Sequence, residues 1–101
     1  NCKLLSPEIL PYEIGNALSA IVKRKQLTTE QALHAIELAD AIPVRLVQPD
    51  IKSALELALR FNIYAYDAYF LQAALSLNCP LLTLDKKMKE VAKQLNIVVL
   101  E

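Results

Sequence analysis

The stretch "LLTLDKKMKEVAKQLNIVVL", Leu81 to Leu100, decides the fold of this chain. Its apolar run 81–84 is typical of a buried strand, residues 86–95 have the composition of a helix, and residues 97–100 form a second apolar run. A helix between two short apolar strands predicts parallel pairing through a right-handed crossover. Parallel sheets are covered on both faces, so we expect helices on each side.

The rest of the chain repeats this alternation. Apolar periodicity and capping residues predict helices over about Pro7–Lys25, Thr28–Ala41, Asp50–Phe61 and Tyr64–Pro80, with a short strand at Val44–Val47. The second of these helices opens with a capping box, in which Thr28 is followed three residues later by a glutamine. The sequence therefore predicts an α/β domain with a short parallel sheet flanked by helices.

Composition limits the classes of function. The 101 residues contain no Gly/Ser-rich or Pro-rich interruption, which predicts a single domain over 1–101. Eleven basic and eleven acidic side chains give a formal net charge of zero, so any contact with nucleic acid must be local. The chain has no apolar run of about 18 residues and no cleavable signal pattern. We expect a cytoplasmic protein with no membrane partner.

Three acidic side chains are predicted to lean toward the core. Asp67 shares a helical face with apolar residues, and Glu13 lies at the margin of an apolar stripe. Asp85 follows an apolar strand, at the edge where open α/β sheets bind ligands. Each also has a structural explanation. Asp85 is a good helix N-cap, Asp67 suits the positive end of a helix dipole, and Glu13 can reach water along its stem.

A convergence of these acids would need a cation. Two like charges about 4 Å apart repel by about 4 kcal/mol at an effective dielectric of about 20. This repulsion is larger than the stabilisation that one helix dipole gives to a carboxylate. The basic residues nearest to them in sequence are Lys86 and Lys87. A divalent cation is the simplest counter-charge, and oxygen-only ligands favour Mg²⁺ or Mn²⁺ over zinc.

Three motifs then carry a family resemblance. "SPEILPYEIGNAL" (6–18), "YAYDAYFLQAA" (64–74) and "LLTLDKKM" (81–88), in this order, resemble a PIN domain of the VapC type, the ribonuclease toxin of toxin–antitoxin pairs. The resemblance implies a Rossmann-like, three-layer α/β fold and endonucleolytic cleavage of RNA. It also implies a homodimer that is inhibited by a VapB-type antitoxin.

The same resemblance assigns roles to individual residues. Glu13, Asp67 and Asp85 fall on acids that bind Mg²⁺ or Mn²⁺ and act as the catalytic residues in that family. Thr83 and Asn16 match positions that support the metal ligands. Members of the family open with a strand that ends in a further Asp, and no such strand precedes Asn1. We therefore expect an N-terminally truncated domain, and the alternative is a short variant in which another chain supplies the strand. Under either account the missing ligand should weaken metal binding and misplace the ion.

Two other functions remain open at this stage. A non-catalytic PIN-like module would act in dimerisation or antitoxin binding through its apolar first and second helices. A receiver-like domain phosphorylated on Asp85 would need an acidic pair on an early strand, and the sequence has none. Binding of Mn²⁺ separates the nuclease from the non-catalytic module.

Overall fold

The computed structural model describes residues 4–100, and short strands alternate with helices along them. Its elements are β1 (Leu5–Pro7), α1 (Leu10–Lys23), α2 (Thr29–Asp40), β2 (Arg45–Val47), α3 (Ile51–Phe61), α4 (Ala65–Leu77), β3 (Leu81–Leu82), α5 (Lys86–Gln94) and β4 (Val99–Leu100). The predicted helices are present with ends shifted by a few residues. The predicted strands are shorter than expected, and Ile97 is a buried core residue instead of part of β4.

All strand pairing is parallel, as predicted. β1 pairs with β2, with Leu5 opposite Arg45, and β3 pairs with β4, with Leu81 opposite Val99. The strands form two separate two-stranded sheets and not one continuous sheet. The predicted α/β class with short parallel strands is confirmed, while the sheet is divided.

One strand was not expected from the sequence. The apolar periodicity predicts a helix from about Pro7, but Leu5–Pro7 forms β1 and α1 begins at Leu10. A proline disfavours helical backbone at the preceding residue, which keeps Ser6 extended. Pro11 lies in the first turn of α1, where a missing N–H costs nothing. Ser6 and Pro7 are buried, and β1 packs against α4.

The core lies around α4 and α5. Leu71 of α4 and Val91 of α5 are almost completely buried, together with Leu81 of β3 and Ile97. A second contact joins α3 to α4 through three small side chains, Ala54, Ala58 and Ala68. Alanines let two helix backbones approach closely, so α3 and α4 are packed as one unit.

Asparagine takes the place of glycine at the helix ends. Asn62 ends α3, Asn78 ends α4 and Asn96 follows α5, with φ of 55°, 53° and 60°. These angles lie in the left-handed region, which glycine and asparagine tolerate best. The chain has one glycine, inside α1, so asparagine provides the sharp stops that fold α3, α4 and α5 against one another.

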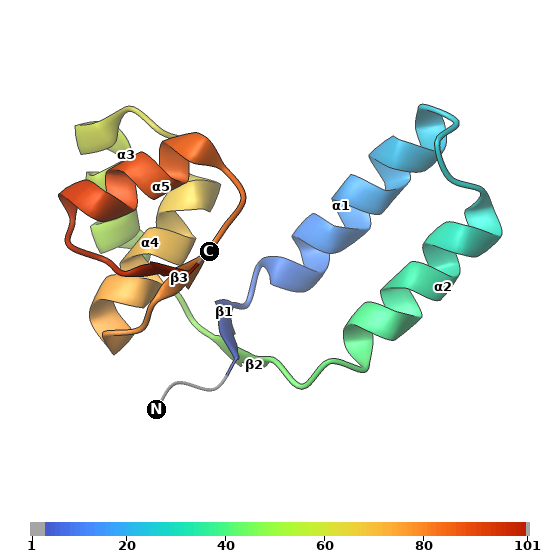
Figure 1. Ribbon diagram of the computed structural model, residues 1–101, viewed down its shortest axis with the longest axis horizontal. Coiled ribbons are helices and arrows are strands. Elements are labelled where there is room, and N and C mark those ends of the chain that lie inside the picture. The colour runs from blue at the N-terminus through green and yellow to red at the C-terminus, as the bar shows by residue number, and fades with distance from the viewer. Residues whose placement is uncertain (1–3, 101) are drawn as a thin grey trace.

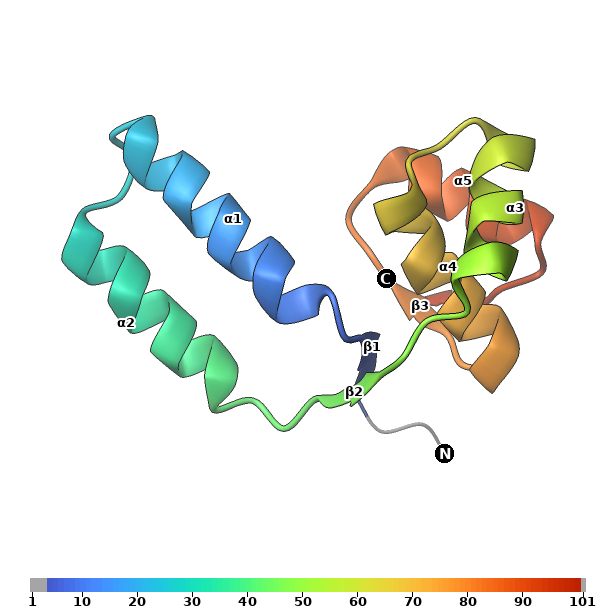
Figure 2. The same cartoon turned by 180° about the vertical axis from the view of Figure 1, so that it is seen from behind.

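The α1–α2 hairpin stands apart from the other helices. Figures 1 and 2 show α1 and α2 on one side and α3, α4 and α5 on the other. Neither helix of the hairpin has a fully buried residue, and Tyr12, Leu33 and Leu38 are exposed. The predicted capping box is present: the Gln31 amide donates to Thr28 Oγ1 at 3.1 Å, and the Thr28 amide donates to Gln31 Oε1 at 2.9 Å. Local hydrogen bonds therefore stabilise the helices of the hairpin, while apolar side chains on them remain exposed.

No helix between residues 4 and 100 combines the length and apolar character needed to cross a bilayer. The longest is α1, with 14 residues, whereas the hydrocarbon core requires about 20.

Candidate functional site

Asp85 lies where β3 leads into α5. Its Oδ1 accepts a hydrogen bond from the Met88 amide at 3.0 Å, so the side chain is the N-cap of α5. The capping role predicted from the sequence is confirmed. No second hydrogen bond to this carboxylate occurs within residues 4–100. The cap therefore fixes the orientation of the carboxylate and leaves its other oxygen, Oδ2, available to a ligand.

Thr83 supports Asp85 through the backbone. Its Oγ1 accepts a hydrogen bond from the Asp85 amide at 3.1 Å, and its side chain is half-buried. The hydroxyl does not bond to the Asp85 carboxylate. Thr83 thus helps to hold the turn from β3 into α5, which is a positioning role.

Asp67 lies in the first turn of α4 and is half-buried. Loss of hydration and the nearby negative charge of Asp85 raise the pKa of the Asp67 carboxyl above its ordinary value of 3.8. Across the described residues, no hydrogen-bond donor or cation pairs with this carboxylate. Two acids from separate elements therefore lie close enough to repel each other, and no cation among residues 4–100 neutralises either of them.

The third predicted acid is not part of this pair. Glu13 is half-buried in the first turn of α1, and Asn16 is exposed one turn later on the same helix. The backbone carbonyl of Asn16 accepts a hydrogen bond from Ser19 Oγ at 2.8 Å, and the side-chain amide of Asn16 forms no hydrogen bond within residues 4–100. In the part of the chain that the structure describes, no three acidic, histidine or cysteine side chains are grouped to hold a metal.

The chemistry of Asp67 and Asp85 nevertheless suits Mg²⁺ or Mn²⁺. Magnesium is commonly held by one or two carboxylates, with waters and substrate phosphates completing its octahedral shell. Two unneutralised carboxylates, one of them partly dehydrated, fit that pattern. The arrangement can accept a cation without a histidine or a cysteine.

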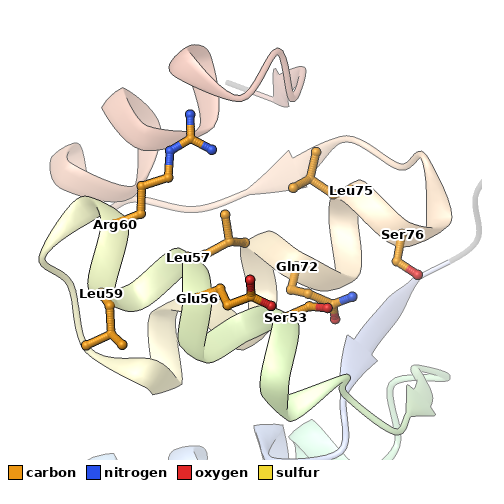
Figure 3. Close-up of a pocket in the computed structure, with 8 residues that line it drawn as sticks. All are labelled: Ser53, Glu56, Leu57, Leu59, Arg60, Gln72, Leu75 and Ser76. Atoms are coloured by element: carbon orange, nitrogen blue, oxygen red, sulfur yellow. The ribbon is translucent and has the colours of Figure 1, made fainter.

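A groove lies elsewhere, between α3 and α4 (Figure 3). Leu57, Leu59 and Leu75 form its apolar part, and Glu56, Arg60 and Gln72 are among its polar residues. None of the predicted site residues lines this groove. The sequence pattern assigned this groove no role, and Leu59, one of its lining residues, is 75% exposed.

Comparison with known proteins agrees with the motifs. The family model of the PIN domain matches residues 3–94. The chain is 33% identical over 87 residues to ribonuclease VapC1 from two strains of Mycobacterium tuberculosis, CDC 1551 / Oshkosh and ATCC 25618 / H37Rv. Each match covers 82% of this chain, and the chain spans 63% of the length of these relatives. The resemblance to VapC-type proteins predicted from the sequence is thus confirmed, and the chain belongs to the PIN domain family.

Proposed function

We propose that this chain is the metal-binding part of a VapC-type endoribonuclease that cleaves RNA with Mg²⁺ or Mn²⁺. The observation that carries the proposal is the pair of acids, in which the loss of hydration and then the charge of Asp85 raise the pKa of Asp67. The cap of α5 accounts for Asp85, but no bond within residues 4–100 accounts for the half-buried carboxylate of Asp67, so a functional cation is the economical reason for the pair.

Asp67 and Asp85 would hold the cation, which when bound would polarise a phosphodiester and lower the pKa of a water molecule. The cap on α5 keeps the Asp85 carboxylate in a fixed orientation, and Thr83 steadies the turn that carries it. Glu13 is the proposed third ligand and Asn16 a supporting residue. Both belong to α1, so their participation requires α1 to lie closer to the acid pair than it does in this structure.

Three further features belong to the same proposal. Residues 1–101 act as a single domain in the cytoplasm, and the protein forms a homodimer. A VapB-type antitoxin inhibits it. The name of the relatives, ribonuclease VapC1, and the exposed apolar side chains of the α1–α2 hairpin support these assignments.

Calorimetric titration with Mn²⁺, followed by cleavage assays on single-stranded RNA, tests the metal site. We expect Asp67→Asn and Asp85→Asn to weaken Mn²⁺ binding and to lower cleavage by at least about 100-fold. Asp50→Asn is the matched control, because Asp50 caps α3 in the same way and lies outside the acid pair. Cleavage that survives in both site variants, after removal of host nucleases, would reject the proposal.

A specific observation favours one alternative, a non-catalytic PIN-like module that acts in dimerisation or antitoxin binding. Neither α1 nor α2 buries a residue fully, and Tyr12, Leu33 and Leu38 on these helices are more than half exposed. Absence of Mn²⁺ binding by the wild-type chain, together with self-association that is lost on Leu33→Ser or Leu38→Ser, would support this alternative.

A further inference from the structure

Positive charge is concentrated on α5, although the chain as a whole is neutral. The nine residues of α5 include four lysines, Lys86, Lys87, Lys89 and Lys93, and one acid, Glu90, which gives the helix a formal charge of +3. Such a local excess attracts polyanions at short range even when the net charge of the protein is zero.

Packing fixes the direction in which these charges point. Met88, Val91 and Ala92 are buried on one side of α5. Lys86, Lys89 and Lys93 follow one another at helical spacing and lie together on the other side, and we call these three the lysine face. With a rise of about 1.5 Å per residue, their Cα atoms are separated by about 4.5 and 6 Å along the helix axis. The lysine face is therefore a single row of charges about 10 Å long.

The residues that the structure describes do not neutralise this row. In residues 4–100, no side chain of the lysine face forms an ion pair or a hydrogen bond. Glu90 lies one turn from Lys86 and is still unpaired with it. The three ammonium groups are thus free to bind an external anion.

The row begins beside the acid pair. α5 starts directly after Asp85, whose charge acts on Asp67. Tyr64 and Tyr66, close to Asp67 in the chain, are 82% and 57% exposed. A row of cations together with accessible aromatic rings is the combination that binds the backbone and the bases of a single-stranded nucleic acid.

We propose that the lysine face of α5 binds consecutive phosphates of a single-stranded RNA and leads the strand to Asp67 and Asp85. This inference rests on the proposed ribonuclease function, because the acid pair is the place to which the strand is led. The exposed rings of Tyr64 and Tyr66 favour a single strand over a duplex, because unpaired bases can stack on them.

Fluorescence anisotropy of a labelled oligouridylate of about 12 nucleotides, in EDTA, measures this binding without cleavage. The variant K86Q/K89Q/K93Q removes the lysine face. The control K23Q/R24Q/K25Q removes the same number of charges from the end of α1 and from the residues that follow it. Five of the six side chains are exposed and Lys89 is half-buried, so circular dichroism checks that each variant is folded. The variant K86R/K89R/K93R keeps the charge and should bind as the wild type does.

Three phosphate contacts contribute about 2 to the slope of log affinity against log salt for a single strand. We expect K86Q/K89Q/K93Q to lose about 2 from this slope and at least tenfold in affinity at low salt, and the α1 control to lose little. Equal losses in the two variants, or no binding by the wild type, would overturn the proposal. Equally strong binding of polyglutamate or of duplex RNA would overturn it as well.

The two proposals fail separately. Asp67→Asn and Asp85→Asn should bind oligouridylate at least as well as the wild type in EDTA, because they remove negative charge beside the path. Salt-dependent binding through α5 without metal-dependent cleavage would leave the lysine face supported and the nuclease rejected.

Discussion

Asp67 and Asp85 lie on different elements and are electrostatically coupled: reduced hydration and the charge of Asp85 together raise the pKa of the Asp67 carboxyl. Asp85 has a local role as the cap of α5, whereas Asp67 has no hydrogen-bond partner in the described residues. Substitutions of the two residues should therefore affect the stability of the fold in different ways.

Asp67→Asn should stabilise the fold at neutral pH. A carboxyl whose pKa is raised on folding contributes stability that is present below its ordinary pKa of 3.8 and is lost as pH rises through the raised value. The uncharged amide of asparagine cannot lose a proton, so the variant keeps this stability at neutral pH. Its free energy of unfolding should be higher than that of the wild type by at most about 1 kcal/mol, because the site is partly hydrated. Urea denaturation near pH 7 and near pH 3 measures it. An advantage of the variant that persists unchanged at the lower pH would contradict this origin.

Substitutions of Asp85 should separate its two roles. Asp85→Asn keeps a side-chain acceptor for the Met88 amide but loses the charge, whereas Asp85→Ala loses both. We expect Asp85→Ala to lower the free energy of unfolding by about 1 kcal/mol relative to Asp85→Asn. Both variants should lose Mn²⁺ binding equally in calorimetry. Full Mn²⁺ affinity in Asp85→Asn would show that the charge of Asp85 does not contribute to the site.

Glu13→Gln tests the proposed third ligand. If α1 brings Glu13 to the bound cation, the affinity for Mn²⁺ should fall by about tenfold, and the substitution should have little effect on the stability of the metal-free chain. Tyr12→Phe, at the exposed neighbouring position, is the control. An unchanged Mn²⁺ isotherm for Glu13→Gln would remove Glu13 from the site.

Thr28→Ala should loosen the hairpin without unfolding the rest of the chain. The substitution removes the acceptor for the Gln31 amide, which costs about 1 kcal/mol of helix stability. Because α1 and α2 have no fully buried residues, the loss should appear as faster hydrogen exchange in α2. The amides of α4 and α5 serve as the internal control. Equal acceleration in all helices would mean that the hairpin and the core unfold together.

Leu71→Ala and Leu59→Ala compare a buried and an exposed leucine. Leu71 is completely buried in the core, and its truncation should cost about 2–5 kcal/mol. Leu59 is 75% exposed on α3, so its loss should change the free energy of unfolding by less than about 0.5 kcal/mol. Chemical denaturation of the two variants measures the difference. Similar costs would mean that the groove between α3 and α4 is covered in solution.

Local chemistry in the sequence was enough to predict every helix and all the strands except β1. The capping pairs that begin at Thr28 and Asp85 act over three residues, so they can be predicted without a tertiary structure. The apolar runs predicted the strands, and parallel pairing followed from the intervening helices. β1 was not predicted because it is only three residues long. Its end is determined by the conformational limits of proline, which a periodic pattern does not report.

Only the tertiary structure decided which of the predicted acids meet. Asp67 and Asp85 are brought together because α4 and α5 pack around a common apolar core that includes Leu71 and Val91. Glu13 belongs to α1, which has no buried residue that could pack it against α4. The strands also form two separate sheets, and Glu13 therefore lies apart from the acid pair. Apolar periodicity specifies which face of a helix is buried. The element that packs against that face is determined by contacts between residues distant in sequence. In this chain those contacts bring two of the predicted acids together and not the third.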